Sequence, residues 1–186
     1  FNALFAHQVQ NLKAELVAGK YGRIQRIKGI GAWKRTRSYF TRNDWAGRVM
    51  REGQWVLDGS LNNALAHFLC QNLFFGGPTQ QGLADLEQVT GEVYRCNLIE
   101  GDDLSCSRIL TRQGFEVLTY TSLAAPEEIV PLTVIETDRA SIHYEDFSRV
   151  RIIHHSSEIE ERESYQEHRI EMILHLCRAF RTGGDY

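Results

Sequence analysis

The sequence lacks the features that mark membrane, secreted and zinc-binding proteins. No apolar run reaches the roughly 18 residues of a membrane helix, and the first residues show no basic start followed by an apolar stretch. The four cysteines, Cys70, Cys96, Cys106 and Cys177, form no C-x-x-C pair, so neither a zinc site nor a disulfide framework is indicated. We expect a soluble, cytoplasmic protein whose cysteines are small buried hydrophobic residues.

An excess of positive charge is also missing. The chain has 24 acidic and 21 basic residues, a formal charge of -3 and a pI near 6.2. The basic residues are scattered, so the chain has no long-range attraction for phosphate backbones or anionic lipid. We therefore expect neither a nucleic acid nor a membrane as a partner.

Motifs of common catalytic and nucleotide sites are absent. The sequence contains no G-x-S-x-G, H-E-x-x-H or G-x-G-x-x-G pattern. The nearest glycine pair is Gly29-Ile30-Gly31, but the third glycine is missing and a basic connection follows instead of a helix. Because no helix start can hold a pyrophosphate, we expect this chain alone to bind neither NAD nor NADP.

Hydrophobic periodicity divides the chain into helical and strand-like segments. Helical spacing occurs at residues 8–18, 60–75 and 158–181, and β-type runs occur at 24–33, 89–98, 104–110, 115–122, 130–136 and 141–153. A polar, aromatic-rich connection covers residues 34–54. Strands this close in sequence are most simply joined as antiparallel neighbours, because a parallel pair needs a long crossover.

These elements predict one domain, residues 1–186, with a single core. The fold class is α+β, with two or three helices on one face of a large, mostly antiparallel open sheet. The other face needs a cover, because a large exposed apolar patch is unfavourable in water. We expect a homo-oligomer that forms through this sheet.

Polar residues on the apolar helix 60–75 are the first candidates for chemistry. Asn63, His67 and Gln71 are spaced by four, and a histidine near neutral pKa can exchange a proton with a substrate hydroxyl. The alternative is a core histidine bonded to a backbone carbonyl. Asp58 is either the N-terminal cap of the helix, a role that Ser60 could also take, or a carboxylate that orients His67 or the substrate.

The connection 39–48 combines aromatic rings with hydrogen-bonding side chains. Tyr39, Arg42, Asn43 and Trp45 form the mixture that binds sugars, although a surface loop pinned by one aromatic residue has a similar composition. No metal site is expected. His154 and His155 point to opposite faces of a strand, and the group His168, Glu171 and His175 belongs to a charge-rich, solvated helix face.

Several segments share their pattern with one known family. They are Leu12 to Gly19, Gly22 to Ile24, Trp33, Tyr39 to Arg48, Gly53 to Gly77 and Val89 to Asp103. The most specific part is Tyr39-x-x-Arg42-Asn43-x-Trp45-Ala46-Gly47-Arg48, followed by Trp55-Val56-Leu57-Asp58 and Asn62-Asn63-Ala64-x-Ala66-His67. Over roughly residues 1–153 the chain resembles the C-terminal domain of the glucose-fructose oxidoreductase, inositol dehydrogenase and MocA family. The resemblance implies a dihydrodipicolinate-reductase-like C-terminal domain fold.

The resemblance also implies a missing partner domain. In that family an N-terminal Rossmann domain binds NAD or NADP and supplies a lysine, usually within a Glu-Lys-Pro motif, and neither is in this sequence. The family commonly carries an Asp and a His four residues apart on the helix that faces the nicotinamide, where this chain has Asn63 and His67. An amide cannot act as a base, so either His67 transfers the proton with the absent lysine or Asp58 takes the carboxylate role.

Three functions follow from these observations. The leading hypothesis is the substrate-binding and oligomerisation domain of an NAD(P)-dependent oxidoreductase that acts on a sugar or polyol hydroxyl and is inactive without its cofactor domain. His67 would transfer the proton, Asn63 and Asp58 would position it, and the loop 39–45 would contact the substrate. The alternatives are an NAD-dependent glycosidase of the same superfamily and a non-catalytic carbohydrate-binding or assembly module.

Overall fold

The computed structural model describes residues 1–146, 148–163 and 168–183. The helical elements are η1 (a 3₁₀ turn, Asn2–Phe5), α1 (His7–Val17), α2 (Arg37–Phe40), η2 (a π-helical turn, Ser60–Ala64), α3 (Ala66–Phe75) and α4 (His168–Thr182). The strands are β1 (Ile24–Lys34), β2 (Met50–Arg51), β3 (Gln54–Trp55), β4 (Leu86–Tyr94), β5 (Leu104–Thr111), β6 (Glu116–Ser122), β7 (Ala124–Thr137), β8 (Ala140–Glu145), β9 (Arg149–His154) and β10 (Ile159–Glu163).

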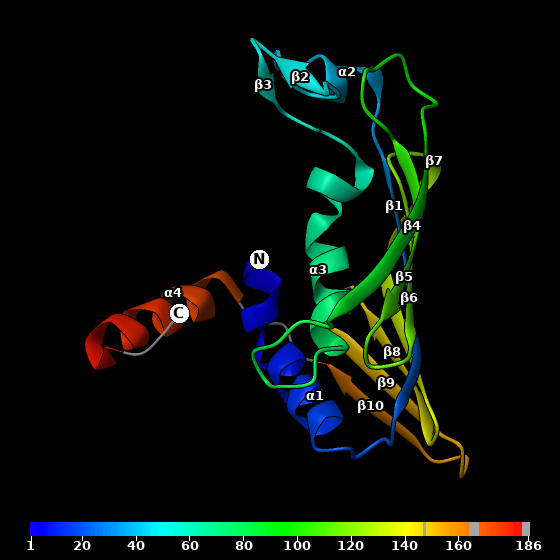
Figure 1. The fold of residues 1–186 in the computed structure, drawn as a ribbon, viewed down its shortest axis with the longest axis vertical. Coiled ribbons are helices and arrows are strands. Elements are labelled where there is room, and N and C mark those ends of the chain that lie inside the picture. Colours follow the sequence, from blue (N-terminus) through cyan, green and yellow to red (C-terminus); the bar gives the residue numbers. More distant parts are fainter. Residues whose placement is uncertain (147, 164–167, 184–186) are drawn as a thin grey trace.

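Eight strands form one sheet in the order β10-β9-β8-β7-β1-β6-β5-β4 (Figure 1). Strands adjacent in sequence pair antiparallel, as predicted, except that β1 lies between β6 and β7. β1 is parallel to β6 and antiparallel to β7. The fold class predicted from the sequence, a large and mostly antiparallel sheet with few helices, is confirmed.

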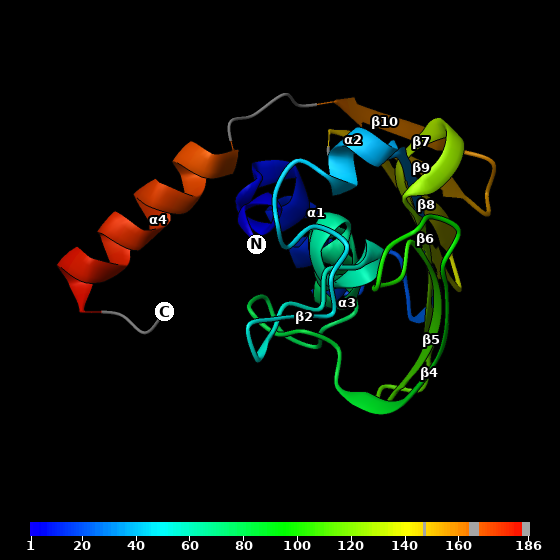
Figure 2. The same cartoon turned by 90° about the horizontal axis from the view of Figure 1, so that it is seen from above.

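The helices α1 and α3 cover one face of the sheet, on its concave side (Figure 2). Strand alternation sends one set of side chains under these helices, as in β8, where Ala140, Ile142 and Tyr144 are buried and the residues between them are partly exposed. Lys13 of α1 is also fully buried, because its ammonium group donates to the carbonyls of Phe74 (2.5 Å) and Gly77 (2.6 Å) at the end of α3. Burial lowers the pKa of Lys13 to about 8.

The contact between α3 and β1 depends on glycine. A Cβ atom at Gly29 would overlap the Asn72 amide and lie 2.9 Å from the Phe68 ring. Phe68 and Asn72 are on the sheet-facing side of α3, and the Thr133 hydroxyl of β7 donates to the Asn72 amide oxygen at 2.6 Å. The helix therefore lies directly on the backbone of the central strand.

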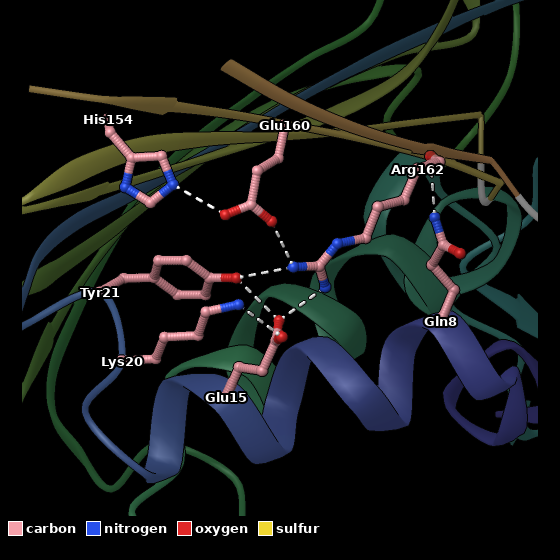
Figure 3. A network of polar contacts seen from close by, with 7 residues as sticks. All are labelled: Gln8, Glu15, Lys20, Tyr21, His154, Glu160 and Arg162. Atoms are coloured by element: carbon pink, nitrogen blue, oxygen red, sulfur yellow. Dashed lines mark hydrogen bonds and ion pairs between the residues drawn. The ribbon is translucent and has the colours of Figure 1, made fainter. Parts of the chain in front are cut away.

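A polar network joins α1 to the far edge of the sheet (Figure 3). The Arg162 guanidinium donates to Glu15 (2.8 Å), Glu160 (2.7 Å) and the Tyr21 hydroxyl (3.1 Å). Hydrogen bonds from Arg162 and His154 hold the pKa of Glu160 at about 2, well below its usual value. This network fixes the edge strand β10 to α1 without an apolar core.

Two predicted segments differ from the structure. The run 141–153 is two strands, β8 and β9, joined by a turn in which Asp146 has a φ of 50°; Phe147 lies outside the described residues. The first part of the predicted helix 158–181 is strand β10, whose alternating side chains pair with β9, while residues 164–167 lie outside the described residues. A short charged strand at an edge has no apolar period by which to recognise it.

The helix α4 contacts η1 and buries none of its described residues. Glu171 pairs with His7 at 3.1 Å and His175 lies against the Phe5 ring, while Ile170 and Ile173, each 54% exposed, point away from them. The apolar side that the sequence predicted is therefore present but uncovered. No helix among the described residues is long and apolar enough to cross a membrane.

The cysteines depart from the prediction of burial. Cys70 and Cys106 are half-buried, but Cys96 and Cys177 are exposed. Cys96 lies in the loop after β4, and Cys177 lies on the uncovered helix α4, so the expectation that all four are core residues is wrong.

We predict that Gly29→Ala destabilises the protein by about 3 kcal/mol or more, because α3 must move away from β1 to admit the methyl group. Gly31→Ala is the matched control on the same strand face, since its Cβ would meet nothing closer than 3.4 Å. Chemical denaturation of both variants measures the difference. Equal losses of stability at the two positions would contradict a direct α3–β1 contact at Gly29.

Candidate functional site

The predicted helix 60–75 is interrupted at the centre of the candidate site. Ser60–Ala64 forms the π-helical turn η2, Leu65 has φ and ψ of -109° and 17°, and α3 begins at Ala66. Asn63 and His67 therefore do not lie on one continuous α-helix, as their spacing predicted. The alternative of a core histidine is wrong for His67, which is exposed; of the three polar residues, only Gln71 is fully buried.

His67 opens onto a cavity of about 200 Å³ between α3, the end of β1 and the start of α4. Trp33, Phe68, His168 and Arg169 are among its lining residues, and the Phe1 ring packs edge-on against the imidazole at 5.1 Å. Desolvation is the main cause that lowers the pKa of His67 below its ordinary value. This shift favours the neutral imidazole, which is the form able to accept a proton.

Asp58 and Asn63 form a second part of the site. The Asp58 carboxylate is buried and accepts from the Gly47 backbone N–H and from the Asn63 amide, both at 2.6 Å. Gly59 precedes η2 without a side-chain cap, so neither Asp58 nor Ser60 caps this turn. Asp58 thus connects the 43–58 loop to η2 through Asn63, and no hydrogen bond of the described residues joins it to His67.

The loop 95–103 supports the second part of the site, and no role for it was predicted from the sequence. The Gly47 carbonyl accepts from the backbone N–H groups of Glu100 and Gly101, both at 2.8 Å. Asp102 accepts from the Ser60 N–H at 3.1 Å and the Ser60 hydroxyl at 2.9 Å. The Asp pair at 102–103 was the available signal, because short carboxylates commonly bond nearby backbone N–H groups.

The structure brings three of the four predicted substrate residues together. The Arg42 guanidinium carbon lies 3.5 Å from the centroid of the Tyr39 ring and 5.3 Å from that of Trp45. Asn43 serves the loop itself, since its side-chain oxygen accepts from the backbone N–H groups of Trp45 (3.2 Å) and Ala46 (2.8 Å). A contact between substrate and the remaining Asn43 amide stays a prediction.

A metal centre is not formed by the described part of the chain, in which no three His, Cys, Asp or Glu side chains gather closely enough to hold an ion. The helical group considered from the sequence is divided among other contacts. Glu171 pairs with His7, His175 lies against Phe5, and His168 lines the cavity of His67.

Sequence comparison finds no matching family model and no matching curated protein. The solved structures with the same fold are oxidoreductases of the glucose-fructose oxidoreductase, inositol dehydrogenase and MocA type, and the fold of this chain is that of their C-terminal domain.

Three of these structures contain different ligands. Levoglucosan dehydrogenase in complex with NADH and levoglucosan matches with a TM-score of 0.77 and 13% identity, over 100% of this chain and 57% of that chain. The WlbA dehydrogenase from Bordetella pertussis, with NADH and UDP-GlcNAcA, matches with a TM-score of 0.73 and 14% identity, over 100% and 52%. An oxidoreductase from Agrobacterium radiobacter, with NAD+, L-tartaric acid and magnesium, matches with a TM-score of 0.65 and 16% identity, over 99% and 54%.

The chain thus spans about half the length of the structures that it matches. At these identities the likeness establishes the fold, while the residues of the site must carry any argument about chemistry.

We predict that Asp58→Ala lowers the free energy of unfolding by about 1–3 kcal/mol, because the buried Gly47 N–H loses its acceptor. Asp44→Ala is the control on the same loop, since Asp44 is exposed and pairs only with Arg51 in an ion pair worth about 1 kcal/mol or less. Denaturation and hydrogen exchange at the Gly47 amide check both variants. Unchanged exchange in Asp58→Ala would show that the carboxylate does not hold the loop.

Proposed function

We propose that this chain is the substrate-binding domain of an NAD(P)-dependent oxidoreductase that acts on a sugar or polyol hydroxyl. The observation that carries the proposal is the neutral His67 imidazole at an aromatic-lined cavity, in a fold found in dehydrogenases that bind NADH with levoglucosan or UDP-GlcNAcA. The aromatic and guanidinium groups of Tyr39, Arg42 and Trp45 suit sugar binding.

The glycine pair of β1 does not fit a dinucleotide. Gly29 and Gly31, the nearest approach to a glycine motif, lie in the middle of β1 beneath Phe68, Asn72 and Leu65, where a pyrophosphate has no access. A hydride acceptor would therefore be held by another domain. The role of this chain is to bind the substrate, orient its hydroxyl and accept the hydroxyl proton at His67.

Two observations support a second domain. The chain spans about half of each matching dehydrogenase, and α4 exposes Ile170, Ile173 and Leu174 to solvent. Apolar side chains aligned on one helix face are stabilised by a partner surface.

The two other functions remain distinguishable by experiment. An NAD-dependent glycosidase would release a free aglycone with no net change in cofactor, whereas the proposed oxidoreductase reduces one cofactor for each product. A non-catalytic carbohydrate module would bind sugars without any His67-dependent turnover when joined to a nucleotide-binding domain.

We predict that His67→Ala, in a full-length enzyme with a nucleotide-binding domain, lowers kcat by about 100-fold or more, the usual contribution of an acid–base residue. Because desolvation lowers the pKa of His67, the wild-type rate should stay constant at neutral pH and fall only in acid, where His67 becomes protonated. His155→Ala, at an exposed position in the β9–β10 turn, is the control. Near-normal turnover of folded His67→Ala would refute the catalytic role.

The open face of the sheet is the proposed site of self-association. Leu132, Ile30 and Tyr120 are paired across β7, β1 and β6 and form an apolar row on this face. Ion pairs border the row, including Arg26 with Glu116 at 2.6 Å. An apolar centre with a charged border is typical of a subunit interface.

We predict that the chain is a dimer or a higher oligomer at micromolar concentration and that Tyr120→Lys shifts it to monomer, because Tyr120, at the β6 end of the row, is 42% exposed. Val89 lies on the other face of the sheet, the one that carries the helices, and is 60% exposed. Val89→Lys should therefore leave the oligomeric state unchanged. Light scattering measures both. A monomeric wild type would contradict the proposal.

A further inference from the structure

Positive charge is concentrated at the end of β1 and in α2. Lys34, Arg35, Arg37 and Arg42 lie within nine residues that contain no Asp or Glu, in a chain with more acidic than basic residues. The interpretation of the basic residues as scattered is wrong for this segment, because the fold brings two of the arginines to the same aromatic ring.

The rings and guanidinium groups alternate along this segment. The Arg35 guanidinium carbon lies 5.0 Å from the centroid of the Trp33 ring and 4.7 Å from that of Tyr39. Arg42 lies 3.5 Å from the Tyr39 ring centroid and 5.3 Å from that of Trp45. We call these five residues the arginine–aromatic stack. Such contacts fix long, flexible side chains in one place.

Neither arginine of the stack has a carboxylate partner within the described ranges. Elsewhere the chain pairs its arginines readily, as Arg26 and Arg108 pair with Glu116 on the sheet. The acidic residue of the adjacent loop, Asp44, pairs with Arg51 at 2.6 Å instead. The stack therefore orders two cations and leaves their charge uncompensated.

The geometry of a guanidinium group leaves its donors available in such a stack. The five N–H donors of a guanidinium group lie in its plane and match a carboxylate or phosphate, while an aromatic ring packs against its face. The Arg35 Nε is buried and has no hydrogen-bond partner among the described residues. Arg42 uses one N–H to donate to the Tyr39 carbonyl at 2.6 Å. The remaining donors can bind an anion.

The stack begins at the cavity of His67. Trp33 lines that cavity and carries Arg35 against its ring, and Arg169 adds a further cation to the cavity lining. A ligand whose reacting hydroxyl reaches His67 would extend its other end along Trp33 toward Arg35 and Arg42.

We propose that the substrate carries an anionic group, a carboxylate or a phosphate, that binds the guanidinium groups of Arg35 and Arg42 while its hydroxyl lies at His67. This assignment rests on the proposed oxidoreductase function and specifies its substrate class. The matching structures do not decide it, because their ligands include neutral levoglucosan and the acidic UDP-GlcNAcA.

Calorimetric titration of the chain with glucuronate, glucose 6-phosphate and methyl glucoside tests the proposal. One of the anionic probes should bind at least about 10-fold more tightly than the neutral glucoside, because a charge-assisted hydrogen bond contributes about that much. Its affinity should fall at high salt. Whichever of the two anionic probes binds more tightly shows whether the site prefers a carboxylate or a phosphate.

Variants separate the stack from general charge. Arg42→Gln and Arg35→Gln should each weaken anion binding by about 10-fold or more, and Tyr39→Leu should weaken it without changing the charge. Two control variants should change the affinity for the anion by less than about 3-fold. They are Arg37→Gln, which lies in α2 with Tyr39 but has no ring contact among the described residues, and Arg112→Gln, in the β5–β6 turn. The proposal is overturned if anion binding survives Arg35→Gln and Arg42→Gln. It is also overturned if the neutral glucoside binds as tightly as the anions, or if none of the three probes binds.

The result is distinguishable from failure of the proposed function. Stack-dependent anion binding without cofactor reduction by a full-length enzyme would leave the anion site standing and refute the oxidoreductase. Efficient oxidation of neutral polyols, unaffected by Arg42→Gln, would refute only the anion site.

Discussion

The direct contact of α3 with the central strand β1 determines where the candidate site lies. Gly29 lets the side chains of Phe68 and Asn72 approach the strand backbone, and the hydrogen bond from Thr133 to Asn72 fixes the helix in register. At the other end of α3, the buried Lys13 ammonium group holds two terminal carbonyls. With both ends fixed, the start of α3 presents His67 beside Trp33 at the end of β1.

The loops around this helix are positioned by carboxylates rather than by apolar packing. Asp58 bonds the 43–58 loop to η2, and Asp102 bonds η2 to the start of β5. Backbone N–H groups in a loop have no strand partners, so a buried carboxylate satisfies them and gives the loop one conformation. The polar residues that resemble catalytic groups in the sequence therefore divide into loop supports, such as Asp58, and groups that open onto the cavity, such as His67.

The sequence predicted the layer architecture because short β-type runs follow one another closely and helix 8–18 has a regular period. It could not predict the position of β1, since the parallel pairing with β6 joins residues about 90 positions apart and leaves no local pattern. The break at Leu65 was missed for a similar reason. Nothing in the apolar run 60–75 indicates a π-helical turn, and that turn separates Asn63 from His67. Residue type was a better guide than spacing, because aromatic residues and arginines at 39–45 met in space as their chemistry indicated.

The core and the loops carry different information about the reaction. Structures with 11–17% identity keep this sheet and its helices, although their ligands range from levoglucosan to UDP-GlcNAcA. A core that tolerates so many substitutions needs only side chains of suitable volume and an alternation of apolar and polar residues along its strands. Such a core does not select a substrate. Selection must come from side chains that the core leaves free, and these lie on the end of β1 and in the loop that follows. In this chain that segment orders two arginines against three aromatic rings without a carboxylate partner among the described residues, so the charge of these arginines is available to the anionic ligand that we propose.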